Sequence, residues 1–283
     1  MRRTDRSVAL GFHRTRPSHA LLEHALSVGI TDVDTAFNYQ AFDGHRELAM
    51  AAGELIHEFT ISTKVGYFPV GNSNYHSLRR WILRQAIEQT VDDLGVPPAV
   101  ILLHNPEQTL KTLHPAQAHD HFADACEELE RAVDAGLCGA WGVASWDPAP
   151  LAKVLRAGSD CPTPSTLMVR AGLSLTAKQL DAGESLGWEL NLDADQRWGM
   201  SPFGGSTSNP TWTTTDLSSF LEPEQDHTPV QAAFRLAFEL PHCTRLAVGT
   251  GNERHLSELC AAIQLEVNLS AVDKYRELIT APG

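Results

Sequence analysis

The sequence predicts one α/β domain of eight βα units, a (β/α)8 or TIM barrel. Short apolar runs alternate with longer segments of helical periodicity along most of the 283 residues, which is the pattern of a parallel βα architecture. The length agrees, because closed barrels of about 250 residues fold around a single core. No change of composition marks a boundary, so we expect a single domain over residues 1–283.

The expected strands are short apolar or alternating runs followed by turn residues. Residues 100–103 are too few for a helix and too apolar for the surface, so they indicate a buried strand of a parallel sheet. The eight expected strands cover residues 8–12, 32–35, 60–65, 100–103, 140–145, 166–169, 197–201 and 246–248.

The expected helices follow these strands and carry capping and stop signals. Ser18 is suited to cap the first helix and Gly29 to end it, while Gly95 and the two prolines after it end the third. The expected helices cover residues 18–28, 46–52, 77–94, 120–135, 151–157, 182–192, 230–239 and 249–263.

Two connections are expected to lack regular structure. A turn-rich loop with Tyr67, Phe68 and Tyr75 follows the third strand. Residues 204–216 are rich in Gly, Ser and Thr, which is typical of a mobile loop.

The net charge limits the classes of partner. Lys and Arg number 22 against 35 Asp and Glu, for a formal charge of −13. Nucleic-acid binding requires a basic surface, so no nucleic-acid partner is expected, although a local pocket for one phosphate is compatible with this charge. The sequence does not predict the oligomeric state.

The cysteines and the hydropathy suggest a cytoplasmic location. The five cysteines (126, 138, 161, 243 and 260) are far apart and form no CxxC pair, so reduced thiols are expected. No window reaches the roughly 20 apolar residues of a membrane span. We therefore expect a soluble protein that is not exported and has no membrane partner.

Four residues suited to acid–base chemistry lie at or just after the ends of three successive strands: Asp34, Tyr39, Lys64 and His104. The carboxyl ends of barrel strands meet at one face, so all four can share a pocket. A phenol has a pKa of about 10, and a nearby ammonium such as Lys64 makes its proton easier to donate. Asp34 could hold Lys64 through an ion pair, and His104 could orient a substrate oxygen or help move its proton. This set suits the reduction of a carbonyl group or the reverse reaction.

Each of these residues also has a structural interpretation. Asp34 could cap a turn, Tyr39 could pack, and His104 could satisfy a backbone group. Lys64 is the hardest to explain in this way, because a lysine in an apolar strand needs a partner.

Metal chemistry is the least favoured alternative. A metal-dependent hydrolase could use Asp32, Asp34 and His104, but no second histidine pair follows the strands. The histidines at 114, 119 and 121 fit no common zinc spacing, so no metal site is expected.

Taken together, the motifs resemble the aldo-keto reductases. The matching segments are Asp34-Thr35-Ala36 with Tyr39, Ser62-Thr63-Lys64-Val65-Gly66, Leu103-His104-Asn105-Pro106, Trp141-Gly142-Val143, Ser201-Pro202-Phe203-Gly204, and Gly249-Thr250 with Leu256. The resemblance extends from about Leu10 to about Leu265. It implies a (β/α)8 barrel, NADPH or NADH as hydride donor, and Tyr39 as general acid, supported by the other three residues of the set.

The resemblance also implies cofactor positions, and several depart from the family pattern. Ala144-Ser145 stands where the family has Ser-Asn, and only Ser145 keeps a side-chain donor. Arg170 replaces a Gln, and Met200 replaces the aromatic residue that stacks on the nicotinamide. Methionine can cover a ring face, but less specifically than tyrosine.

The adenosine end departs less from the pattern. Gly249-Thr250-Gly251-Asn252 precedes a helix whose amino end favours a phosphate, and an ordinary glycine-rich turn is the alternative interpretation. Arg254 and His255 lie near the family's arginine for the 2′-phosphate, so we expect NADPH, with NADH as the second possibility. The expected cofactor residues are Ser145, Arg170, Met200, Ser201, Phe203, Gly204, Gly249, Thr250, Asn252, Arg254, His255 and Glu258.

The expected function is NADPH-dependent reduction of an aldehyde or ketone, whose identity the sequence does not give, to an alcohol. A regulatory or sensor subunit that binds a nicotinamide cofactor with little turnover is the alternative, motivated by Ala144, Arg170 and Met200. The walls of a substrate pocket are expected from Phe12, His13, Tyr67, Phe68, Trp146 and Trp212.

Overall fold

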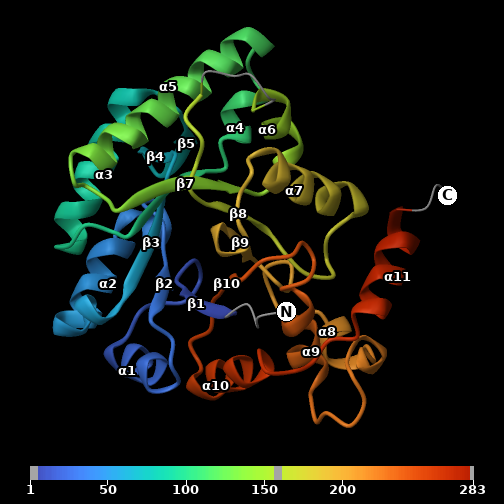
Figure 1. The fold of residues 1–283 in the computed structure, drawn as a ribbon. Coiled ribbons are helices and arrows are strands. Elements are labelled where there is room, and N and C mark those ends of the chain that lie inside the picture. Colours follow the sequence, from blue (N-terminus) through green and yellow to red (C-terminus); the bar gives the residue numbers. More distant parts are fainter. Residues whose placement is uncertain (1–5, 156–160, 281–283) are drawn as a thin grey trace.

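Eight parallel strands close into a barrel, as the sequence predicts (Figure 1). The computed structural model describes residues 6–155 and 161–280. The order around the barrel is β1-β10-β9-β8-β7-β6-β3-β2. The strands are β1 (Ser7–Gly11), β2 (Asp32–Asp34), β3 (Thr60–Val65), β6 (Val100–His104), β7 (Ala140–Ser145), β8 (Leu167–Arg170), β9 (Arg197–Met200) and β10 (Arg245–Val248).

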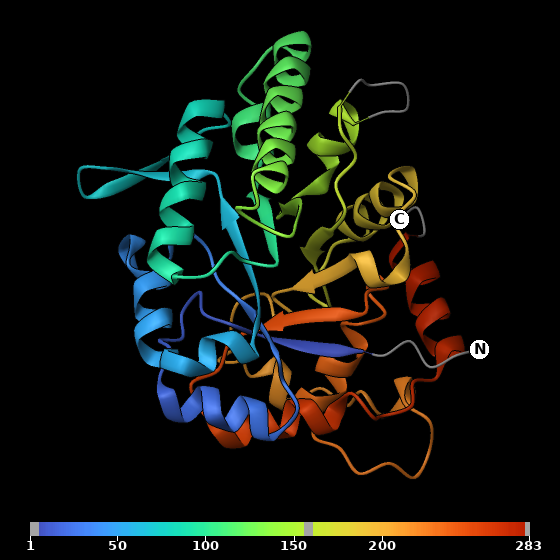
Figure 2. The same cartoon turned by 60° about the vertical axis from the view of Figure 1, so that its left-hand side comes forward.

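The helices surround the barrel (Figures 1 and 2). They are α1 (His19–Ser27), α2 (Gly44–Ala52), α3 (Arg80–Leu94), α4 (Glu107–Leu110), α5 (Pro115–Asp134), α6 (Pro148–Val154), α7 (Ala177–Glu189), α8 (Thr211–Thr214), α9 (Pro229–Leu236), α10 (Glu253–Ala262) and α11 (Leu269–Thr280). None of the helices in the described part of the chain is long and apolar enough to cross a membrane.

Local capping explains where the helix starts differ from the predicted ones. Ser18 caps α1 as expected, with its hydroxyl accepting from the amide of Leu21 at 3.3 Å. Helix α5 begins at residue 115 rather than 120, because Pro115 is suited to the first helical position. Helix α7 begins at 177 rather than 182, because Thr176 and Gln179 form a capping box.

Some segments differ from the prediction or lie outside the described residues. Helices α4, α8 and α11 are not predicted, and α8 lies within residues 204–216, where no regular structure is expected. The expected loop after β3 is instead an antiparallel hairpin of β4 (Tyr67–Val70) and β5 (Ser73–His76), which projects from the barrel at the upper left of Figure 2. Gly71 supplies the positive φ of its turn. Residues 1–5, 156–160 and 281–283 of the expected domain, with the expected helix end at Ala157, lie outside the described residues.

The barrel interior is filled by a compact layer of side chains. Its buried members are Ala9, Val100, Leu102, Ala144, Met168, Trp198 and Ala247. Gly142 of β7 also faces this layer, where a Cβ would lie 2.3 Å from the carbonyl oxygen of Thr166 and 2.7 Å from Cδ2 of Leu102. Close packing of this layer leaves no room for a side chain at Gly142.

The substitution Gly142→Ala is expected to destabilise the protein by about 3 kcal/mol, because the added methyl group collides with backbone. Gly183→Ala in α7 is the matched control, since its Cβ would make only ordinary contacts, 3.5 Å from Val169. Urea unfolding of both variants measures the difference. Equal stabilities of the two variants would contradict the close packing at Gly142.

Candidate active site

The carboxyl ends of the strands open into a cleft of about 950 Å³. The four expected catalytic residues all line it: Asp34, Tyr39, Lys64 and His104. Asp34 ends β2, Lys64 is the penultimate residue of β3, and His104 ends β6. Closure of the barrel therefore brings together side chains that are far apart in the sequence.

A buried ion pair joins Asp34 to Lys64. The two side chains approach to 2.5 Å, and the residues are only 5% and 1% exposed. Ser62 donates to the other carboxylate oxygen at 3.0 Å, and Lys64 also donates to the carbonyl of Thr35 at 2.9 Å. Burial alone would lower the pKa of Lys64, but Asp34 and Tyr39 raise it above its usual value. Lys64 is therefore a fixed positive charge.

Tyr39 lies beside this charge. Nζ of Lys64 is 5.5 Å from the centroid of its ring. Burial raises the pKa of Tyr39, the charge of Lys64 opposes the rise, and the pKa stays above its usual value. The expected acidifying effect of Lys64 is thus present, but it does not outweigh burial. At neutral pH the phenol keeps its proton.

The backbone after Tyr39 is held in an unusual turn. Gln40, Ala41 and Phe42 have φ values of 50°, 56° and 75°, which cost energy for residues with a Cβ. The Gln40 amide donates to the carbonyls of Phe12 at 3.0 Å and Thr15 at 3.2 Å. These bonds tie the turn to the loop after β1 and fix the position of Tyr39. Gln40 could not be predicted from the sequence, because a glutamine in the left-handed region has no local sequence signature.

His104 is neutral, and its backbone carbonyl is held by a hydrogen bond from His76. Burial, followed by the charge of Lys64, lowers the pKa of His104 well below its usual value. Nε2 of His76 bonds the carbonyl oxygen of His104 at 2.8 Å, and Nδ1 of His76 contacts the hydroxyl of Thr109 at 2.6 Å. Because a carbonyl only accepts, Nε2 of His76 carries the hydrogen. A Cβ at Gly66 would lie 2.9 Å from the same oxygen, so this position requires glycine.

Three of the expected wall residues line the cleft: His13, Tyr67 and Trp146. The ring of His13 lies 4.9 Å from that of Tyr39. Tyr67 packs edge-on against His104 at 4.9 Å and accepts from the amide of Asn105 at 3.3 Å. Asn38 and Asn105, which we did not predict, also line the cleft, and the Oδ1 atom of each is buried without a partner.

The other three expected wall residues are not on the wall. Phe12 and Phe68 are 2% and 4% exposed and belong to the hydrophobic cores around the barrel. Trp212 lies in α8 and packs edge-on against Phe203, with ring centroids 5.6 Å apart. None of these three residues is among those that line the cleft.

The end of β7 does not present the expected donor. Ser145 is fully buried, and its hydroxyl donates to the carboxylate of Glu107 at 3.0 Å. Glu107 also accepts from the amides of Trp146 at 2.8 Å and Asp147 at 3.1 Å, and burial raises its pKa. Ala144, the neighbour that faces the barrel interior, has no polar group. Glu107 therefore fixes the backbone at Trp146 and Asp147. It also accepts the hydrogen bond that the Ser145 hydroxyl could otherwise donate to a ligand.

The expected cofactor residues divide into two groups. Eight line the cleft: Met200, Ser201, Phe203, Gly249, Thr250, Arg254, His255 and Glu258. The other four are not among its lining residues: Ser145, Arg170, Gly204 and Asn252. Arg170 lies against Trp146, with its guanidinium 4.6 Å from the ring.

The far end of the cleft carries charged side chains and a capped helix. Arg254 is exposed and pairs with Glu258 at 2.8 Å. The Asn252 side chain accepts from the amides of Arg254 at 2.9 Å and His255 at 3.3 Å. Asn252 therefore already occupies two of the amides at the amino end of α10, where the sequence predicts a phosphate.

One polar contact spans the cleft rim. The Arg14 guanidinium, from the loop after β1, donates to the carbonyl of Gly205, in the loop after β9, at 2.9 Å. Both residues line the cleft. The two loops therefore meet across the space between β1 and β9.

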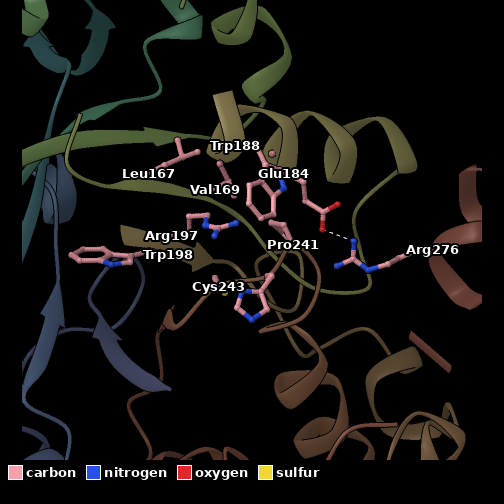
Figure 3. A pocket seen from close by; sticks show the side chains of 11 residues that line it. Leu167, Val169, Glu184, Trp188, Arg197, Trp198, Pro241, Cys243 and Arg276 are labelled. Carbon is pink, nitrogen blue, oxygen red and sulfur yellow. Dashed lines mark hydrogen bonds and ion pairs between the residues drawn. The ribbon is translucent and has the colours of Figure 1, made fainter. Parts of the chain in front are cut away.

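A second cavity, of about 210 Å³, lies near the starts of β8 and β9 (Figure 3). Its charged side chains are engaged with their neighbours. Glu184 pairs with Arg276, and the Arg197 guanidinium lies 4.7 Å from the Trp188 ring. The expected catalytic residues line the larger cleft, so we place the candidate site there.

The metal-hydrolase alternative does not match this geometry. It needs Asp32 and Asp34 at one site, but Asp32 pairs with Arg245 at 3.1 Å at the amino ends of the strands. Within residues 6–155 and 161–280, no group of three or more His, Cys, Asp or Glu side chains could hold a metal ion.

Comparison with known proteins identifies the family of the chain. The family model "Aldo/keto reductase family" matches residues 13–173, which is more than half of the chain. The chain belongs to the aldo-keto reductase family. Membership supports, in general terms, an oxidoreductase acting on small carbonyl compounds. No curated protein matches the chain.

Solved structures share the fold. A putative aldo-keto reductase from Pseudomonas aeruginosa is 20% identical, with a TM-score of 0.64 and coverage of 90% of each chain. The holo form of an aldo-keto reductase from Bacillus halodurans is 13% identical, with a TM-score of 0.73 and coverage of 98% of this chain and 93% of that one. An aldo-keto reductase from Klebsiella pneumoniae in complex with NADPH is 18% identical, with a TM-score of 0.66 and coverage of 98% and 92%.

The variant Asp34→Asn is expected to destabilise the protein by about 3 kcal/mol or more, because the Lys64 ammonium stays buried without a counter-charge. The double variant Asp34→Asn with Lys64→Met removes both charges and should recover most of this loss. Urea unfolding at pH 7 measures both. The control is Glu88→Gln, which breaks an exposed pair with Arg84 and should cost less than about 1 kcal/mol. A cost for Asp34→Asn no larger than that of the control would show that the buried pair is not essential.

Proposed function

We propose that the protein reduces an aldehyde or ketone to an alcohol, with NADPH as hydride donor and Tyr39 as general acid. The observation that carries the proposal is the protonated phenol of Tyr39 beside the buried Lys64–Asp34 pair, with a neutral His104 at the same end of the cleft. An acid, a fixed cation and a neutral imidazole around one space are the groups that a carbonyl reduction requires.

The residues of the cleft fit a dinucleotide at one end and in the middle. The volume of about 950 Å³ lies within the upper range of cofactor sites. The cleft extends from Tyr39 to the start of α10, where Arg254 and His255 would hold a phosphate of the adenosine. Met200, Ser201 and Phe203 line the space between and would support the ring and ribose.

Each side chain of the site has its own role in the carbonyl reduction. When bound, NADPH supplies a hydride to the carbonyl carbon. Tyr39 gives its phenolic proton to the carbonyl oxygen as negative charge develops there. Lys64 then stabilises the phenolate of Tyr39, and Asp34 keeps Lys64 charged and in place. His104, being neutral, hydrogen-bonds the substrate oxygen and orients it.

The substitution Tyr39→Phe is expected to lower kcat/KM for carbonyl reduction by about 10² to 10⁴, because the general acid is lost. Lys64→Met should give a loss of similar size. The control is Tyr75→Phe, an exposed tyrosine of the β5 hairpin strand that does not line the cleft. Oxidation of NADPH with a panel of aldehydes and ketones measures all three. The proposal fails if Tyr39→Phe and Lys64→Met match the wild type.

The substitution Arg254→Ala is expected to raise the Kd of NADPH about tenfold and leave that of NADH unchanged. The reason is the loss of one charge-assisted contact to the 2′-phosphate. Titration calorimetry with each cofactor measures both values, and Arg84→Ala on α3 controls for loss of a surface charge. Equal effects on the two cofactors, or tighter binding of NADH by the wild type, would contradict the assignment of Arg254.

The second candidate is a cofactor-binding regulatory or sensor subunit with little turnover. The observation that favours it is the end of β7, where Ser145 is engaged with Glu107 and Ala144 has no donor. Both candidates predict cofactor binding. Turnover separates them, because the sensor binds NADPH and oxidises none of it with any carbonyl compound of the panel.

A further inference from the structure

Arg170 carries a charge that has no anionic partner among the described residues. It is the last residue of β8, and its Nε is buried without a hydrogen bond. Within residues 6–155 and 161–280, its guanidinium contacts the ring of Trp146 in a cation–π interaction. Arginine stays charged at any pH at which the protein is folded. The end of β8 therefore holds an uncompensated positive charge.

This charge lies directly beside the candidate site. Met168 belongs to the interior layer of the barrel, so Arg170, two residues later on the same strand, also faces inward at the carboxyl end. Its register partner on β9 is Met200. Met200 and Trp146, its neighbours on either side, both line the cleft.

The other charges around the cleft do not cancel it. Lys64 pairs with Asp34, and Arg254 pairs with Glu258. Glu107 lies under the backbone of Trp146, where it accepts three hydrogen bonds and forms no ion pair with the described residues. A carboxylate at Glu107 weakens the field of Arg170 without contacting it.

We infer that Arg170 makes the site bind the reduced cofactor in preference to the oxidised one. The inference rests on the proposed function. The reduced nicotinamide ring is neutral, whereas the oxidised ring carries one positive charge. A ring held against Met200 would lie beside β9, which is adjacent to the strand of Arg170, and adjacent strands are about 4.8 Å apart. Like charges at such separations repel appreciably in a partly buried cleft. The departure from the family's neutral Gln therefore selects the redox state.

The preference has a direct consequence for the reaction. A tenfold tighter binding of NADPH than of NADP⁺ raises the midpoint potential of the bound two-electron couple by about 30 mV. The oxidised product then leaves readily, and alcohol oxidation, which must start from NADP⁺, begins from a weakly bound cofactor. The same shift makes bound NADPH a weaker hydride donor, so Arg170 favours release of the oxidised cofactor and does not add to the driving force of hydride transfer.

The test measures binding and needs no carbonyl substrate. Titration calorimetry gives the Kd of NADPH and of NADP⁺ for the wild type, Arg170→Gln, Arg170→Met and Arg170→Lys. We expect the wild type to bind NADPH at least tenfold tighter. Both neutral variants should bind NADP⁺ more tightly, so that the ratio of the NADP⁺ Kd to the NADPH Kd falls severalfold. Arg170→Lys keeps the charge and should keep most of the wild-type ratio. Adenosine 2′,5′-bisphosphate, which lacks the nicotinamide, should bind equally to all four proteins.

Two neutral variants are used in case one of them fails to fold. Gln and Met differ in polarity, but both remove the charge of Arg170. A wild-type ratio near one overturns the inference, as does an unchanged ratio in the neutral variants. Equal losses of affinity for both forms also overturn it, since Arg170 would then only hold the amide of the ring. These outcomes leave the proposed function intact. That function fails separately if the wild type binds neither form or if Tyr39→Phe retains full turnover.

Discussion

The buried ion pair between Asp34 and Lys64 is the interaction on which the site depends. A lysine that is 1% exposed is tolerated inside a barrel only with a counter-charge in contact. The pair joins the adjacent strands β2 and β3 next to Tyr39. Its positive end opposes the effect of burial on the pKa of Tyr39 and lowers that of His104. Burial thus raises the pKa of Tyr39 and keeps the phenol protonated despite this cation, whereas burial and the cation together lower the pKa of His104 and keep the imidazole neutral.

The sequence predicts the barrel and the four residues around this pair for the same physical reason. Strand and helix periodicities are local, and closure of a parallel barrel brings the carboxyl ends of all strands to one face. Closure of the barrel is therefore enough to bring Tyr39, Lys64 and His104 together. Lys64 was the strongest signal, because an apolar strand hides a charge only when a partner is near.

The walls and the cofactor side could not be predicted in the same way, because they depend on contacts between loops. Glu107, which accepts from Ser145, comes two residues after Asn105, whose φ of 53° lies in the left-handed region. Part of this was accessible: Trp141 and Val143 pack outside the barrel, so the two-residue period places Ser145 outside and Ala144 inside. Applying that period to the end of β7 would have excluded Ser145 as a donor.

The two sides of the cleft differ in how their charges are compensated. On the side of β2 and β3, Lys64 has a carboxylate and a carbonyl within hydrogen-bond distance, so its charge contributes to a stable fold without a ligand. On the side of β8, the Nε of Arg170 is buried without a partner, and an aromatic face offers its charge only weak stabilisation. An arrangement that costs stability and lies beside a cleft indicates a functional constraint on that residue. The charge at Arg170 is therefore better explained by what occupies the cleft than by the packing of the barrel.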